Sequence, residues 1–153
     1  MKNNLYDSDY YSWTCQQAKL LKEGKLNELD IENLIEEVET MGKSQYRTLK
    51  SCIEQLLLHL LKWRMQSQKK NDLHDMELWY RSWKTSIVKQ RLDIKDELDE
   101  NQTLINKLDD IIPIAYGRAR LLAAKAMDCN IKDFPDTCPW TFDQIMIENW
   151  YPE

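Results

Sequence analysis

Apolar residues return along this chain at every third or fourth position, which is the spacing of one face of an α-helix. The strict alternation of an exposed strand is not the dominant pattern. Three glycines and four prolines in 153 residues also leave few points at which many short strands would turn. The pattern therefore predicts an all-α fold.

Capping residues and glycines divide the pattern into about five main helices. Gly24 and Gly42 are expected to end the first two, and Ser44 is expected to cap the third. Thr141 and Gln144 have the spacing of a capping box for a short C-terminal helix. The predicted helices cover residues 8–23, 27–42, 44–68, 73–98 and 102–127. We expect a single-domain helical bundle over residues 1–153.

The helix predicted over residues 102–127 contains Pro113, a residue that ordinarily ends a helix. The apolar positions nevertheless keep the same helical phase before and after the proline, from Leu104 to Ala126. We therefore expect one helix that is kinked near Pro113 rather than two separate helices.

The composition of the chain indicates in which cellular compartment the protein works. The N-terminal residues contain no apolar segment of the kind found in signal peptides, and no apolar run approaches the roughly 18 residues that span a bilayer. Four cysteines occur without a CxxC pair, which is typical of reduced thiols. These features predict a cytoplasmic protein that does not use a membrane.

Charge is distributed unevenly. Residues 43–91 carry eleven basic and four acidic side chains, a net charge of +7. The remaining residues carry ten basic and twenty-two acidic side chains, a net charge of −12, which together give the formal charge of −5. The basic region 43–91 is thus a candidate for contact with an anionic partner.

Five blocks follow one another in a distinctive order: LYDSDYYSWTCQQAKLL, ENLIEEVETMGKS, LLLHLLKW, SWKTSIVKQR and FPDTCPWTFDQIM. Together they resemble the bacterial, largely cyanobacterial, family called domain of unknown function 29, from about Leu5 to Glu153. The resemblance implies a compact helical domain. It implies no activity, and no catalytic or binding residue is carried over from it. The segment 66–75 departs from the length and composition common in the family.

His59 interrupts the leucines of LLLHLLKW and lies at the edge of that helix's apolar arc, beside Cys52 and Trp63. A half-buried imidazole needs a hydrogen-bond partner. If the helices over 27–42 and 44–68 form an antiparallel hairpin, one of the carboxylates of Glu32, Glu36 and Glu39 can reach it.

Two interpretations of His59 follow. In the first, Glu39 only orients a structural histidine. In the second, His59, Glu36 and Glu39 bind a metal ion in a small metal-dependent enzyme, the one cofactor that the sequence suggests. No ExxH pair accompanies these residues, so the structural interpretation is favoured and an enzyme is not expected. A Cys52–His59 nucleophile is disfavoured further, because a thiol at the margin of an apolar face is usually inert.

The basic region supports the leading functional hypothesis, a non-enzymatic binding or regulatory module with a macromolecular partner. An acidic protein surface and a nucleic acid are both candidate partners, and the oligomeric state is left open. Trp79 and Trp83 share a helical face with Ile87, so we expect them in the core. Paired or solvated charges are the alternative interpretation. The candidate partner-binding residues are Lys43, Arg47, Lys50, Lys69, Lys70, Arg81, Lys84, Lys89 and Arg91.

Overall fold

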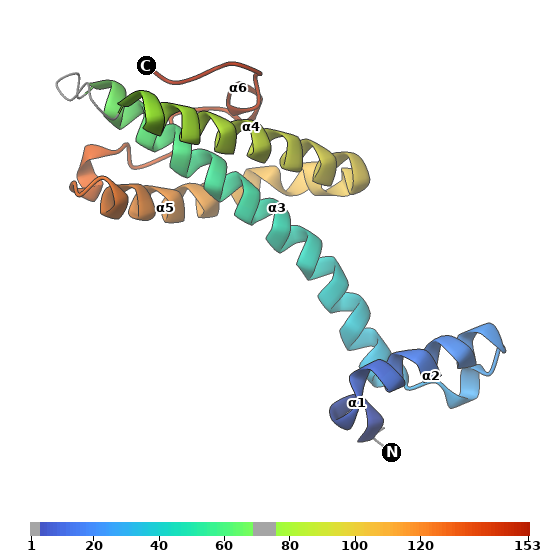
Figure 1. Cartoon of the computed structure of the whole chain (residues 1–153). Coiled ribbons are helices and arrows are strands. Elements are labelled where there is room, and N and C mark those ends of the chain that lie inside the picture. The colour runs from blue at the N-terminus through green and yellow to red at the C-terminus, as the bar shows by residue number, and fades with distance from the viewer. Residues whose placement is uncertain (1–3, 69–75) are drawn as a thin grey trace. The chain divides into compact units, whose positions relative to one another are not determined.

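A computed structural model describes residues 4–68 and 76–153 of the chain. These residues form α-helices and short 3₁₀ turns without a β-strand, which confirms the predicted all-α class. The helices are α1 (Asn4–Ser8), α2 (Tyr10–Lys22), α3 (Ile31–Gln68), α4 (Met76–Glu100), α5 (Leu108–Ala126) and α6 (Phe142–Ile145), shown in Figure 1. Among the described residues, no helix has the length and apolar character needed to cross a membrane.

The helices expected over 27–42 and 44–68 are one continuous helix, α3, and the predicted break at Gly42 is wrong. A glycine ends a helix when it adopts the left-handed conformation. Gly24 does so, with φ of 70°, and α2 ends just before it. Gly42 lacks a positive φ and lies inside α3 as an ordinary helical residue.

The chain falls into two compact units, Met1–Ser44 and Gln45–Glu153. The prediction of one domain over residues 1–153 stays a prediction, because compactness does not show whether the units fold independently.

Polar contacts around one tryptophan hold the first unit together. The Trp13 side chain is 2% exposed and donates from Nε1 to Oδ2 of Asp30 at 2.9 Å. Tyr6 and Tyr10 donate from their hydroxyls to the two carboxylate oxygens of Glu37, at 2.5 and 2.6 Å. These hydrogen bonds raise the pKa of Tyr6 to about 12 and lower the pKa of Glu37. Trp13 is the one fully buried large apolar side chain among the described residues of this unit.

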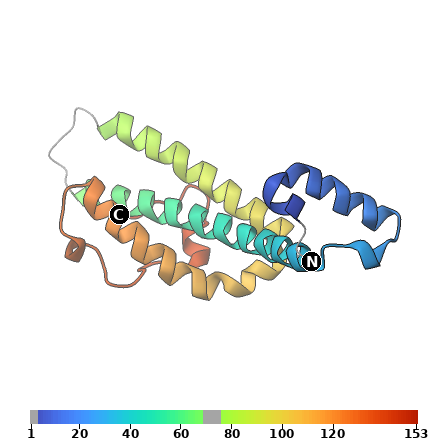
Figure 2. The ribbon, with the colours of Figure 1, turned by 90° about the horizontal axis from the view of Figure 1, so that it is seen from below.

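The second unit contains the hydrophobic core. Its helices α4 and α5 flank the second part of α3 in both views of the ribbon (Figures 1 and 2). The apolar arc predicted for LLLHLLKW faces this core, where Leu49, Ile53, Leu56 and Leu60 are fully buried. They pack in one cluster with Ile87 and Ile94 of α4, Ile111, Ala115 and Ala119 of α5, and Ile145 of α6.

Pro113 lies within α5, so the helix passes through the proline as predicted. Only one backbone hydrogen bond is lost, since Pro113 has no N–H to donate to the Asp109 carbonyl. The predicted start at residue 102 is wrong, because Gln102–Lys107 form a 3₁₀ turn and α5 begins at Leu108. The kink itself stays a prediction.

The C-terminal segment packs against the helices of the second unit and is hydrogen-bonded to α4. Phe134 and Ile145 are 5% and 1% exposed and belong to the core cluster of this unit. Arg91 of α4 donates from Nε to the Ile145 carbonyl at 2.8 Å and from Nη2 to the Trp150 carbonyl at 2.7 Å. The outer side of α4 and the last residues of the chain therefore form one surface.

Candidate partner-binding surface

His59 finds its hydrogen-bond partner within its own helix. Its Nδ1 lies 2.8 Å from the carbonyl oxygen of Gln55. A carbonyl only accepts, so Nδ1 carries the proton and Nε2 is the unprotonated nitrogen of the neutral ring. Burial lowers the pKa of His59, opposed by this hydrogen bond and aided by the charge of Lys62. The geometry is that of a structural, uncharged histidine.

Glu36 and Glu39 precede His59 in the same continuous helix, so the hairpin contact proposed for them is wrong. Within residues 4–68 and 76–153, no group of three or more His, Cys, Asp or Glu side chains has the arrangement to hold a metal ion. The metal site at His59, Glu36 and Glu39 stays a prediction.

Cys52 and Cys138 do not have the environment of nucleophiles. Burial raises the pKa of Cys52, and nearby Asp93 adds to the effect. Burial also raises the pKa of Cys138, whose Sγ donates to the Trp140 carbonyl at 3.3 Å. Nucleophilic cysteines have a lowered pKa instead.

The nine basic residues predicted to bind a partner do not share one environment. Lys43 and Arg47 are exposed on α3, and the Nζ of Lys50 lies 5.9 Å from the ring centroid of Tyr46. Lys69 and Lys70 fall outside the described residues.

Arg91 and Lys89 make polar contacts within the second unit. Arg91 is only 8% exposed, and its two hydrogen bonds to main-chain carbonyls make it a structural side chain rather than a partner-binding one. Lys89 is exposed, but its Nζ is 2.6 Å from the Asp93 carboxylate one turn away. Arg81 and Lys84 of α4 are exposed, and the Lys84 Nζ lies 5.8 Å from the ring centroid of Tyr151.

Aromatic side chains of α3, α4 and the C-terminal segment contact one another near Arg81 and Lys84. Trp63 stacks on Tyr151 with ring centroids 4.2 Å apart and also contacts Tyr80 at 4.4 Å. Trp79 and Trp83 stack on each other at 6.3 Å. The expectation that both belong to the core is wrong for Trp79, which is 47% exposed. Trp79 lies about 80° around the helix from Ile87, which is fully buried.

One face of α4 combines apolar and basic side chains, and we call it the α4 face. Its apolar members Leu78, Val88 and Leu92 are 65%, 45% and 58% exposed. At 100° per residue, they share an arc of about 120° with the basic members. The basic members are Arg81, Lys84 and Lys95, all exposed.

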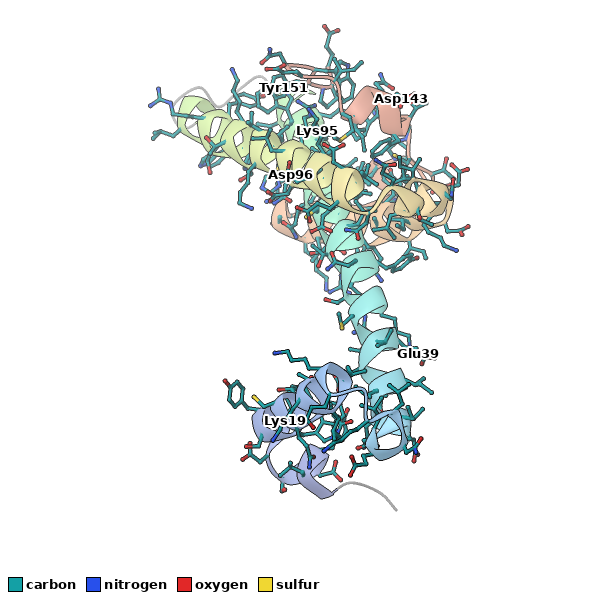
Figure 3. All side chains as sticks on the ribbon, turned by 90° about the vertical axis from the view of Figure 1, so that its right-hand side faces the viewer. Lys19, Glu39, Lys95, Asp96, Asp143 and Tyr151 are labelled. Carbon is teal, nitrogen blue, oxygen red and sulfur yellow. The ribbon has the colours of Figure 1, made fainter. Side chains whose placement is uncertain are left out.

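Sequence reasoning missed Lys95, which lies on α4 beyond the predicted basic region (Figure 3). The signal was present in the outward-facing series of residues 78, 81, 85, 88, 92 and 95. It was obscured because the aromatic series on the same helix was assigned to the core.

A groove of about 330 Å³ adjoins the α4 face. It runs between α4 and the C-terminal segment, with Val88, Leu92 and Met146 as apolar walls. Lys95, Glu148, Asn149 and the buried Arg91 supply its polar edge. An apolar side chain of a partner fits the apolar walls of this groove, and a carboxylate beside it can pair with Lys95.

The sequence model of a family described as Domain of unknown function DUF29 matches residues 5–151. The chain belongs to this family. No curated protein and no solved structure matches the chain. Membership of the DUF29 family carries no activity with it, so the function of this member has to be argued from its own side chains.

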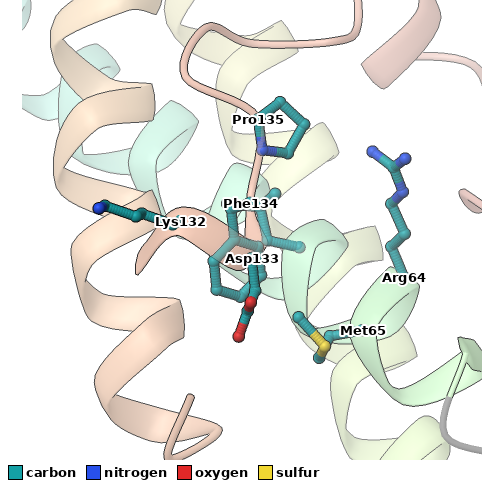
Figure 4. A pocket seen from close by; sticks show the side chains of 7 residues that line it. Arg64, Met65, Lys132, Asp133, Phe134 and Pro135 are labelled. Atoms are coloured by element: carbon teal, nitrogen blue, oxygen red, sulfur yellow. The ribbon is translucent and has the colours of Figure 1, made fainter. Parts of the chain in front are cut away.

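Two other hollows of this DUF29 chain are less suited to a charged partner. Arg64 and Lys132 line a cavity of about 230 Å³, but their charged ends point in different directions (Figure 4). A cavity of about 460 Å³ beside Pro113 and Trp140 contains the Asp136 carboxylate, which is 3.0 Å from Nη2 of Arg120. Neither brings several unpaired charges of one sign together.

Proposed function

We propose that this protein is a non-enzymatic binding module whose α4 face takes an acidic, apolar helix of a protein partner. The observation that carries the proposal is the mixture of Leu78, Val88 and Leu92 with exposed basic residues on one arc of α4. Large exposed apolar side chains mark interaction sites when they gather on one face. Basic side chains among them favour a partner with carboxylates, since complementary charges accelerate association and select the partner.

The adjoining groove supports a helical partner. A helix presents apolar side chains at i, i+3, i+4 and i+7, and such anchors commonly enter grooves between elements. One anchor can pack on the apolar surface formed by Val88, Leu92 and Met146, and a neighbouring carboxylate of the partner can pair with Lys95.

A fluorescein-labelled helical peptide of Leu and Glu, with Leu at that spacing, tests the proposal by fluorescence anisotropy. Wild-type protein is expected to bind it, and Lys84→Glu with Lys95→Glu to weaken binding about tenfold, because two attractive pairs become repulsive. Lys89→Glu is the matched control on the same helix and is expected to change little, because Asp93 already holds that ammonium. Equal losses in all variants, or no binding, would contradict the proposal.

Single-stranded nucleic acid is a second candidate because of the exposed Trp79, stacked on Trp83. Bases stack on such rings, and phosphates pair with neighbouring cations. A labelled oligothymidylate titrated under the same conditions separates the two. If the protein binds the oligonucleotide but not the peptide, and Trp79→Ala abolishes that binding, then the partner is a nucleic acid rather than a protein helix.

A further inference from the structure

The first unit leaves a row of large apolar side chains uncovered on α3. Ile31, Ile35, Val38 and Met41 are 52%, 54%, 65% and 65% exposed. Their spacing places them on one side of the helix, within an arc of about 120°. The contacts of α1 and α2 lie elsewhere on α3, since Tyr6 and Tyr10 bind Glu37, and Trp13 binds Asp30 just before the helix.

Three glutamates border this row. Glu32, Glu36 and Glu39 are exposed and occupy an adjacent arc of about 60° (Figure 3 labels Glu39). None of them takes part in an ion pair with another described residue. We call the four apolar residues and these three glutamates the acidic stripe.

The charge of the acidic stripe argues against pairing with itself. Residues 28–42 contain no Lys or Arg. Two stripes facing each other would therefore bury apolar surface while gaining no pair of opposite charges, and their carboxylates would repel.

The α4 face has the complementary charge, because its exposed apolar residues are accompanied by basic side chains, whereas those of the acidic stripe are accompanied by glutamates. The proposed function calls for an acidic, apolar helix, and the first unit presents one. We propose that the partner of the α4 face is the acidic stripe of a second copy of this chain. The proposal rests on the proposed function and adds the identity of the partner.

The contact is between two different surfaces, so its symmetry has two forms. A reciprocal pair, in which each copy lends its stripe to the other, closes as a dimer. A one-way contact continues into longer assemblies that grow with concentration. In both forms, mass above the 18.4 kDa of one chain is the signature.

Sedimentation velocity of the full chain at low salt tests this. Wild-type protein is expected to sediment above the monomer, and Val38→Asp to sediment as a monomer because a carboxylate replaces an exposed apolar contact. Raising the salt to about 0.5 M is expected to weaken association by screening the charges.

Charge reversal distinguishes a specific contact from a damaged fold. Glu32→Lys with Glu36→Lys gives a basic stripe, and Lys84→Glu with Lys95→Glu gives an acidic α4 face. Each variant alone is expected to be monomeric, while a mixture of the two associates again, because each then meets its opposite. Asp99→Lys with Glu100→Lys, two exposed carboxylates outside both surfaces, is the matched control and is expected to associate like wild type.

A monomeric wild type, or a mixture that stays monomeric, would overturn the inference. The peptide titration of the Val38→Asp protein then shows what remains. If its α4 face still binds the Leu–Glu peptide, only the identity of the partner is wrong. If it does not, the proposed function fails as well.

Discussion

His59 is kept neutral by its surroundings rather than by a catalytic partner. Its Nδ1–H is fixed to Gln55 one turn away, and the ring is removed from water at the margin of a leucine-rich face. This hydrogen bond places the proton on Nδ1 and fixes the tautomer of the ring. The burial of the ring also links the stability of the fold to pH.

The lowered pKa of His59 sets the sign of that link. The unfolded chain, whose histidine pKa is near 6.5, binds the proton before the folded protein does. The contribution of neutral His59 to the free energy of unfolding is therefore fully present above about pH 6.5 and is lost as the pH falls below it. Urea unfolding at several pH values between about 5.5 and 7.5 is expected to show wild type losing stability on the acidic side and His59→Gln losing less.

The His74→Gln protein provides the control, since His59 is then the only histidine in the chain. Its imidazole resonances are expected to titrate below the value for a free histidine. A normal or raised pKa would contradict the burial described for the ring.

At the scale of elements, the conformation of a single glycine decides how many helices the chain has. Gly24 and Gly42 are both followed by lysine and preceded by sequence with helical periodicity. Gly24 has the left-handed conformation that only glycine adopts without cost, and Gly42 does not. Substitution by alanine separates the two cases.

Gly42→Ala is expected to raise the free energy of unfolding by about 0.5–1 kcal/mol, because alanine is the better helix former. A Cβ at this position meets no atom within 4 Å, so no clash offsets the gain. Gly24→Ala is expected to lower the free energy of unfolding by about 1–2 kcal/mol, because a side chain is strained at its positive φ. Urea unfolding followed by circular dichroism measures both. A destabilised Gly42→Ala protein would mean that α3 is broken there.

The sequence was sufficient for the elements whose signals are local. Helical periodicity, the end of α2 before Gly24 and the cap of α6, where the Thr141 hydroxyl accepts from the Gln144 N–H, were all predictable. The continuity of α3 was not, since a glycine inside helical sequence is compatible with either an end or a continuation.

The candidate surface was predictable only in part, because it depends on contacts far apart in sequence. Arg91 was assigned to a partner because its acceptors, the carbonyls of Ile145 and Trp150, are contributed by a distant segment. Trp79 was assigned to the core because periodicity shows that a helix has an apolar side without showing which side is covered.

At the scale of the whole molecule, the two units differ in how much apolar surface they bury. The second unit has a continuous core over α3, α4, α5 and α6, whereas the first relies on Trp13 and a set of hydrogen bonds. A unit of this size without a sizeable core has little stability of its own.

Hydrogen exchange followed by mass spectrometry is expected to show this difference. Amides of α2 in the first unit should exchange well before those of residues 53–61, because opening the first unit exposes little buried surface. Measurement at a low protein concentration removes any protection from self-association. Equal protection of both segments would show that the two units open together.

The hydrogen bonds of Arg91 also have a consequence for the order in which the chain is made. The guanidinium on α4 emerges from the ribosome 54 residues before the carbonyl of Ile145 and 59 before that of Trp150. At about 5–20 residues per second, translation leaves that charge without these acceptors for several seconds. Tyr151, which stacks on Trp63 of α3, is made later still. The second unit therefore cannot complete its packing until residues 145–151 have been made.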